Sequence, residues 1–176
     1  MKILVALDGS SPSEAVLKPL NQLIDTQKNE VDLVSVVDYS TQKPVWPSKT
    51  KYQAPVGAEF STMSGYKPYE RMAPPAESSS QRRERMRTGA TEYLQKVSKG
   101  YFKGKASAMV LAGKDPAKAI VDFAKKEGTD LIVITTTGRS GLARVLLGSV
   151  ASQVLKSGVA PVLMIRPSTN AKSRKP

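Results

Sequence analysis

Short apolar runs alternate with amphipathic stretches along most of this 176-residue chain. Uninterrupted apolar runs bounded by polar residues or glycine are typical of strands that are buried on both faces of a sheet. They predict five strands, at residues 2–7, 31–37, 107–112, 130–135 and 161–165. Between them, apolar residues at helical spacing predict four helices, at residues 12–24, 81–100, 116–127 and 150–156.

Polar residues mark where two of these helices begin. Ser11 has the features of an N-cap, with Pro12 in the first helical position and Glu14 closing a capping box. Asp115 has the same relation to the proline that follows it, and Gly128 is the expected terminator of that later helix. The chain therefore repeats a strand–helix–strand unit, which implies right-handed crossovers between parallel strands.

Five strands that alternate with helices predict an α/β fold, in which an open five-stranded parallel sheet is covered by helices on both faces. Ligands of such three-layer folds bind beyond the carboxyl ends of the strands, where the strand order reverses. The loops that follow residues 7 and 135 are therefore the places where we expect a binding site.

The regular pattern stops between residues 38 and 80, where neither helical nor strand periodicity is visible. Half of the chain's 12 prolines lie in this segment. A loop of that length is uncommon in a compact domain, and we interpret it as a proline-rich, partly disordered insertion. We therefore expect a single domain at residues 1–168, followed by a loose basic tail at residues 169–176.

The composition excludes several kinds of chemistry. The chain contains no cysteine and no histidine, which excludes a disulfide framework, a zinc ribbon, a thiol nucleophile and Ser-His-Asp catalysis. A net charge of +12 favours anionic partners such as phosphates or nucleic acid. The first apolar run is too short for an export signal and no run is long enough to span a membrane, so we expect a cytoplasmic protein.

A glycine-rich segment after the fourth predicted strand offers a site for an anion. Gly138 allows the backbone to approach a ligand, while Gly148 and Ser149 open a helix whose free N–H groups favour negative charge. The Ser149 hydroxyl is a further donor, and Arg139 is equally suited to screening phosphate charge and to a solvated basic loop. The alternative is a plain connector in which Ser149 only caps the helix. The Gly-Lys-Ser/Thr sequence of a P-loop is absent from the chain.

Both ends of the chain resemble the universal stress protein family. The similarity rests on Ile-Leu-Val-Ala-Leu-Asp-Gly-Ser at residues 3–10, on Gly-Lys-Asp-Pro at residues 113–116 and on the block from residue 130 to residue 165. ATP-binding members of that family carry the motif G-x2-G-x9-G-[ST], which is matched here by Gly138 and by the Gly-Ser pair at residues 148–149. A threonine, Thr135, stands where the motif has its first glycine.

The resemblance implies a Rossmann-like fold of the adenine nucleotide alpha hydrolase type, with strand order 3-2-1-4-5. It implies that ATP or another adenine nucleotide binds with Mg2+ or Mn2+, and that Asp8 faces the ribose or the ion. Ala6 and Val36 would then flank the adenine, and the Val150 amide would join Ser149 at the phosphates. From the residues alone, Asp8 is also suited to an Asx turn, while Ala6 and Val36 are also suited to the interior of a sheet.

We therefore expect an ATP-binding regulatory module of the stress response with at most slow ATP hydrolysis. One alternative is a dimeric interaction scaffold of the same fold that has lost the nucleotide, which Thr135 favours. A second and less favoured alternative is nucleic-acid binding, since residues 81–105 contain eight Lys and Arg against two Glu. The resemblance further implies a homodimer formed through the edge strand at residues 161–165.

Overall fold

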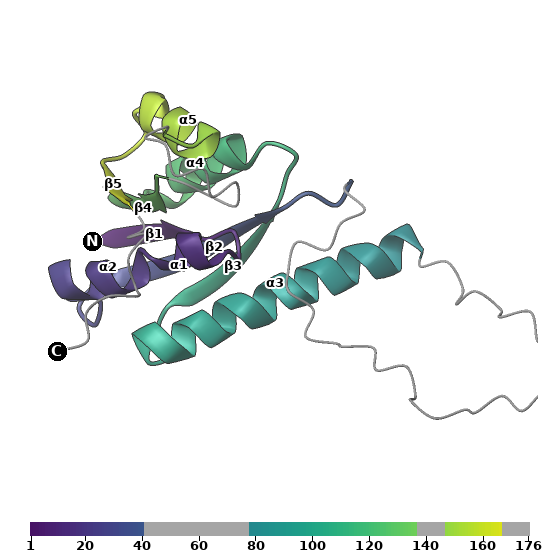
Figure 1. Ribbon diagram of the computed structural model, residues 1–176, viewed down its shortest axis with the longest axis horizontal. Coiled ribbons are helices and arrows are strands. Elements are labelled where there is room, and N and C mark those ends of the chain that lie inside the picture. The colour runs from purple at the N-terminus through teal and green to yellow at the C-terminus, as the bar shows by residue number, and fades with distance from the viewer. Residues whose placement is uncertain (41–77, 137–146, 167–176) are drawn as a thin grey trace, which may run out of the picture.

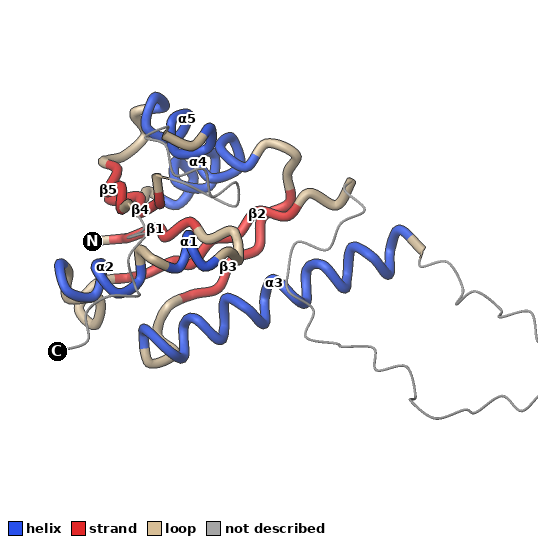
Figure 2. Tube along the Cα trace, viewed as in Figure 1, coloured by secondary structure: helices blue, strands red, loops and turns tan. Residues whose placement is uncertain are grey.

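The five strands form one parallel sheet in the order β3-β2-β1-β4-β5 (Figures 1 and 2), which confirms the expected fold and strand order. The computed structural model describes residues 1–40, 78–136 and 147–166. The expected tail and nearly all of the expected insertion lie outside these residues, so the single-domain organisation stays a prediction.

Each strand lies within one residue of its predicted bounds. The strands are β1 (Lys2–Ala6), β2 (Glu30–Val37), β3 (Ser107–Ala112), β4 (Leu131–Thr135) and β5 (Val162–Ile165). The helices are α1 (Ser11–Glu14), α2 (Leu17–Leu23), α3 (Ser79–Phe102), α4 (Pro116–Glu127) and α5 (Ser149–Ser157). Among the described residues, no helix is long and apolar enough to cross a membrane.

The helices form a layer on each face of the sheet (Figure 2). Alternate residues of β1 show the division, because Ile3 and Val5 belong to one core and Leu4 and Ala6 to the other. Residues from α2 and α3 fill the first core, and residues from α4 and α5 fill the second. Since neighbouring residues of a strand point to opposite faces, both sides of β1 are buried, as its continuous apolar sequence predicts.

The predicted first helix is wrong as a single element, because the structure divides it into α1 and α2. Pro19 lies in the first turn of α2 and has no N–H group to donate to the carbonyl of Ala15. The helix is interrupted at that carbonyl. Its N-cap is Ser10, not the predicted Ser11: the Ser10 hydroxyl accepts a hydrogen bond from the Ser13 N–H at 3.2 Å.

The long helix α3 begins two residues earlier than predicted. Its N-cap, Ser78, forms a reciprocal capping box with Gln81, and the helix runs for 24 residues. At 1.5 Å per residue this is about 36 Å, so the first turns of α3 continue past the carboxyl ends of the strands (Figure 1). Met86 packs against Val37 at the end of β2 in a small third core.

A cluster of charges lies at the amino edge of the sheet, at the opposite ends of the strands from the expected ligand site. The Lys2 ammonium is 3.1 Å from a Glu127 carboxylate oxygen, 3.7 Å from Asp32 and 3.8 Å from Glu30. Burial raises the pKa of Asp32, and the charge of Lys2 opposes that rise. The same lysine lowers the pKa of Glu127 through a hydrogen bond.

Candidate functional site

The strand order reverses between β1 and β4, which are neighbours in the centre of the sheet. From β1 the chain continues into α1 and α2 on one face, whereas the chain after β4 continues to α5 on the other face. The carboxyl edge between these two strands is therefore the position at which a parallel α/β fold binds its ligand. Asp8 follows β1, and the start of α5 lies beside the end of β4.

Serines fix the turn that carries Asp8. The Asp8 Oδ1 atom accepts hydrogen bonds from the Ser10 N–H at 3.0 Å and from the Ser10 hydroxyl at 2.5 Å. Gly9 between them has a positive φ of 78°, which favours glycine at that position. The Ser13 hydroxyl donates to the Ser10 carbonyl at 2.8 Å and accepts from the Asp8 N–H at 3.3 Å. This network confirms the Asx turn and holds the half-buried Asp8 carboxylate at the carboxyl edge.

The phenol of Tyr93 from α3 lies near the Asp8 turn and the start of α1. Burial raises the pKa of its phenol, and the neighbouring carboxylate of Glu14, with a smaller effect from Asp8, raises it further. The Tyr93 side chain also packs against the core that contains Val16 and Leu17. From the sequence, Tyr93 is expected only on the apolar face of a helix. The structure shows in addition that the packing of α3 against the sheet brings Tyr93 close to the Asp8 turn.

The start of α5 is fixed to the end of β4 by one backbone hydrogen bond. The Gly148 N–H donates to the Thr136 carbonyl at 2.7 Å, and Thr136 in turn donates to Ile165 of β5 at 3.1 Å. Gly148 is the N-cap, and no side chain of the described residues caps the helix, so the alternative in which Ser149 serves as a plain N-cap is wrong. The first N–H groups of a helix have no partner within the helix. Ser149 and Val150 therefore offer backbone donors at the carboxyl edge.

Electrostatics at the start of α5 also favour an anion. The first turn of the nine-residue helix contains no acidic residue. The aligned peptide dipoles give a helix a partial positive charge of roughly half a unit at this end. A phosphate group placed there would meet both the dipole and the free N–H groups, which is the usual geometry of phosphate binding in α/β folds.

Thr135 continues β4 in an ordinary extended conformation and pairs with Ile165. This is the backbone that we expect of a β-branched residue at the first position of the glycine motif. The alternation along β4 places the side chain of Thr135 on the face of Leu131 and Val133, which is the face opposite to α5. The side chain is buried, with 6% exposed. Thr135 therefore does not obstruct the start of α5.

Ala6 and Val36 lie on the α4–α5 face of the sheet. Ala6 is buried, with only 7% exposed, and Val36 is half-buried beside Gly113 at the end of β3. A Cβ atom added to Gly113 would lie 3.7 Å from the Val36 side chain and 3.4 Å from Ala119 of α4. Val36 therefore offers more apolar surface to a ligand than Ala6 does.

The remaining predicted site residues, Gly138 and Arg139, lie outside the described residues. The described part of the chain contains no group of three or more acidic, histidine or cysteine side chains that could hold a metal ion. A single carboxylate such as Asp8 fits the way in which Mg2+ is bound by one or two carboxylates together with phosphates and water. These residues would therefore hold a divalent ion only as part of a complex with phosphate.

Comparisons with known proteins agree on one family. The family model described as the universal stress protein family matches residues 1–166. Universal stress protein MJ0531 from Methanocaldococcus jannaschii is 55% identical over 51 residues, which are 29% of this chain and 30% of that protein. Universal stress protein Sll1388 from Synechocystis is 27% identical over 94% of this chain and 97% of its own length. The aligned segment thus spans about a third of MJ0531, whereas it spans nearly all of Sll1388.

Solved structures share the fold at low sequence identity. The structure of MJ0577 has a TM-score of 0.66 and 23% identity, over 96% of this chain and 97% of that one. A universal stress protein in complex with cAMP has a TM-score of 0.56 and 16% identity, over 96% and 98% of the two chains. An Arabidopsis thaliana protein of the family with AMP bound has a TM-score of 0.54 and 16% identity, over 96% and 93%.

Proposed function

Because this chain belongs to the universal stress protein family, we propose that it is a regulatory module of the stress response that binds an adenine nucleotide, with ATP as the first candidate. The observation that carries the proposal is the uncapped start of α5, which the Gly148–Thr136 hydrogen bond holds at the carboxyl edge of β4. The Asp8 turn lies at the same edge, on the neighbouring strand β1.

The ligands of two structural neighbours support the choice of an adenine nucleotide. One neighbour is a complex with cAMP and the other has AMP bound, and both share the parallel sheet of this chain. Cyclic AMP and AMP have the base, the ribose and one phosphate in common. ATP has two further phosphates. We propose ATP because residues 138–149 match most of the glycine motif of ATP-binding members of the family.

We assign a role to each part of the site in this proposal. The backbone N–H groups of Ser149 and Val150, with the Ser149 hydroxyl, bind the phosphates. Asp8 accepts a hydrogen bond from the ribose or coordinates a phosphate-bound Mg2+ or Mn2+. The adenine lies against Val36 and the edge of Ala6, while Gly138 and Arg139 contribute from outside the described residues.

The partial positive charge at the start of α5 compensates only part of the negative charge of the phosphates, and a divalent ion would neutralise more of it. No residue of this proposal acts as a catalyst, and slow hydrolysis at most is the expected activity. We also propose a cytoplasmic location and a homodimer through β5, whose outer edge has no partner strand in the described sheet.

The competing function is a scaffold of the same fold without a nucleotide. Thr135 at the first motif position favours this function. The extended backbone of Thr135, and the position of its side chain on the face of the sheet opposite to α5, argue against it. Titration calorimetry and a thermal shift with ATP and Mg2+ on the full chain separate the two functions. Saturable heat and a rise in Tm support nucleotide binding, whereas no heat and no shift at millimolar ATP would contradict ATP binding and favour the scaffold.

A further inference from the structure

Helix α3 and the turn after it carry the excess positive charge of the described fold. Residues 82–105 contain eight Lys and Arg but only two Glu, which gives this stretch a net charge of +6. All other described residues together contain nine Lys and Arg and ten Asp and Glu, which gives a net charge of −1. Among the described residues, the excess positive charge is therefore concentrated on α3 and the turn after it.

The cations of α3 form two clusters. The arginine cluster occupies the first turns, and the lysine cluster occupies the last turns and the loop that follows. They consist of Arg82, Arg83, Arg85 and Arg87, and of Lys96, Lys99, Lys103 and Lys105. All are exposed except Arg82, which is half-buried. Arg85 and Lys99 are 14 residues apart, or about 20 Å along the helix axis.

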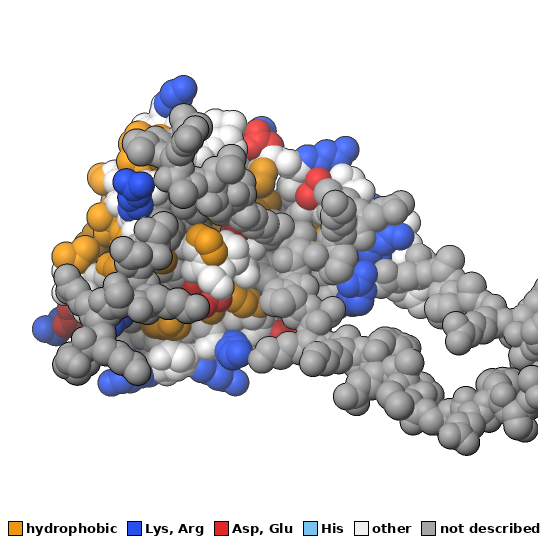
Figure 3. Space-filling view, viewed as in Figure 1, with side chains coloured by type: hydrophobic (Ala, Val, Ile, Leu, Met, Phe, Trp, Pro, Cys, Tyr) orange, Lys and Arg blue, Asp and Glu red, His pale blue; other side chains and the backbone are white. Residues whose placement is uncertain are grey.

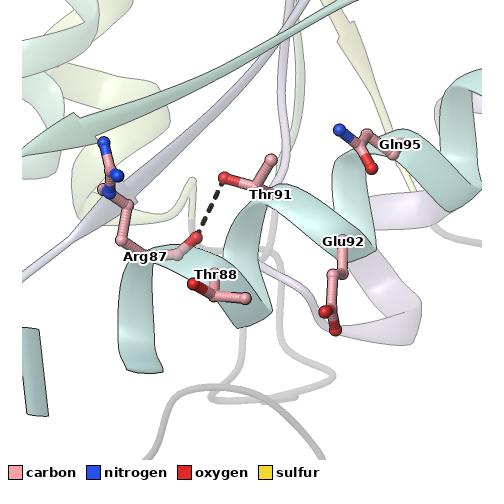
Figure 4. Close-up of a pocket in the computed structure, with 5 residues that line it drawn as sticks. All are labelled: Arg87, Thr88, Thr91, Glu92 and Gln95. Atoms are coloured by element: carbon pink, nitrogen blue, oxygen red, sulfur yellow. Dashed lines mark hydrogen bonds between the residues drawn. The ribbon is translucent and has the colours of Figure 1, made fainter. Parts of the chain in front are cut away.

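A strip of polar side chains, called the polar strip below, lies between the two clusters on the outer side of the helix. Thr88, Thr91 and Gln95 follow one another at helical spacing and line a shallow hollow with Arg87 and Glu92 (Figure 4). The Thr91 hydroxyl donates to the Arg87 carbonyl at 2.9 Å, so it is turned along the helix. Hydroxyl and amide side chains of this kind hydrogen-bond to phosphates and sugars in complexes with nucleic acids.

The outward face of α3 has little apolar surface with which to enter a lipid bilayer. Met86, Ala90, Leu94 and Val97 are buried against the sheet. Tyr101 is the one large hydrophobic residue of α3 that is exposed. Figure 3 shows Lys and Arg side chains at intervals over the part of the view where Figure 1 places α3. Helices that lie at a membrane surface bury an apolar face in the lipid. The apolar face of α3 is already buried in the protein core, so α3 lacks the surface for this kind of membrane binding.

From this arrangement we propose that the outer face of α3 binds the phosphate backbone of double-stranded nucleic acid without sequence specificity. A helix with its side chains is about 10–12 Å wide, which matches the roughly 12 Å width of the major groove of DNA. Arg85, Lys96 and Lys99 share the outward side of the helix and then contact the phosphates along the groove. The polar strip faces the groove. This inference does not depend on the nucleotide site.

The experiment measures binding of a labelled DNA duplex of about 20 base pairs, two helical turns, by fluorescence anisotropy over a series of salt concentrations. The test variant replaces Arg85, Lys96 and Lys99 with glutamine, which keeps helix propensity. We expect its Kd at low salt to rise at least tenfold, and the slope of log K against log salt to fall by roughly 2 to 3 units, since each phosphate contact contributes about 0.9. The single variant Lys99→Gln should lower the slope by about 0.9.

The matched control removes the same charge from α4, by replacing the exposed residues Lys118, Lys125 and Lys126 with glutamine. Its Kd should change by less than about threefold if the contact is made by α3. Equal losses in both triple variants, or no binding by the unmodified protein at low salt, would overturn the proposal. Tighter binding to vesicles that contain phosphatidylserine than to the duplex at the same salt would assign the face to a membrane instead. Circular dichroism establishes that each variant is folded.

Discussion

Asp8 is held at the carboxyl edge by the serines that follow it, and this makes its two possible roles compatible. Its Oδ1 atom accepts from both the N–H and the hydroxyl of Ser10. The Ser10 hydroxyl also caps α1 by accepting from Ser13. A carboxylate that is already oriented loses less conformational freedom when it binds a ligand. The Asx turn therefore prepares Asp8 for the ribose or for a phosphate-bound ion.

Replacing Ser10 with alanine should weaken both stability and nucleotide binding. Loss of the N-cap costs about 1 kcal/mol of unfolding free energy, and the Asp8 carboxylate loses one of its two fixed donors. We expect ATP affinity to fall about five- to tenfold, which is roughly 1 to 1.4 kcal/mol. Ser78→Ala is the matched control because Ser78 is the N-cap of α3. It should cost similar stability by urea denaturation and leave the calorimetric affinity unchanged; equal losses of affinity in both variants would contradict the role of Ser10.

Replacing Thr135 with glycine tests the one departure from the family motif. The side chain of Thr135 lies on the face opposite to α5, so its removal should leave ATP affinity equal or slightly better. Stability should fall by about 1 kcal/mol, because glycine is unfavourable in a strand. Calorimetry and urea denaturation measure the two quantities. A tenfold or larger loss of affinity, about 1.4 kcal/mol, would mean that the Thr135 hydroxyl contacts the nucleotide.

Individual elements differ in how far the sequence predicts them. The five apolar runs predict the strands, although only β1, β2 and β4 are largely buried and the edge strands β3 and β5 are partly exposed. Helix α4 matches its predicted bounds because Asp115 caps it and Gly128 ends it. The first helix is predicted as one element because its apolar spacing is continuous. The break is a backbone effect of Pro19 that the apolar pattern does not contain. The sequence also locates Asp8 and Gly148 in the two loops at the site, whereas the place of Tyr93 depends on how α3 packs.

The charged cluster on β1, β2 and α4 predicts opposite pH effects for two carboxylates. The pKa of buried Asp32 is raised above its ordinary 3.8. The folded protein therefore holds that proton more readily, and the stability from this group is lost as pH rises through the raised pKa. The pKa of Glu127 is lowered from its ordinary 4.5, so its contribution is present above that value and is lost as pH falls through the lowered pKa.

Two neutral variants measure these signs, through urea denaturation at about pH 3.5 and about pH 7. For each variant, the quantity compared is its unfolding free energy minus that of the unmodified protein. This difference should increase with pH for Asp32→Asn. It should decrease over the same range for Glu127→Gln, because that variant loses a carboxylate that Lys2 binds at 3.1 Å. A decrease in both variants would mean that Lys2 stabilises the Asp32 carboxylate more than burial destabilises it.

On the scale of the whole molecule, the two edges of the sheet are β3 and β5. An edge strand presents unpaired backbone groups, and proteins commonly protect such an edge by pairing or covering it. All four residues of β5 are half-buried, and Val162 and Met164 extend the core beneath α4 and α5. We propose that a second copy covers this edge in a two-fold symmetric contact.

The proposed dimer predicts a mass in solution of about twice the 19.0 kDa of the chain. Light scattering at tens of micromolar protein measures it. Met164→Lys would place a charge at the contact and should shift the mass toward that of the monomer with an unchanged circular dichroism spectrum, whereas Met109→Lys on the opposite edge strand should leave the mass unchanged. A monomer mass for the unmodified protein would contradict the proposed contact.

Titration calorimetry of Gly148→Val with ATP and Mg2+ tests whether the start of α5 binds the phosphates of an adenine nucleotide. The backbone of Gly148 has φ −56° and ψ 150°, which a valine can adopt, so the variant should fold. Gly100→Val is the matched control, since a Cβ atom there meets nothing within 4 Å. We predict that binding is lost in Gly148→Val and unchanged in Gly100→Val. Undiminished binding by Gly148→Val would contradict the account.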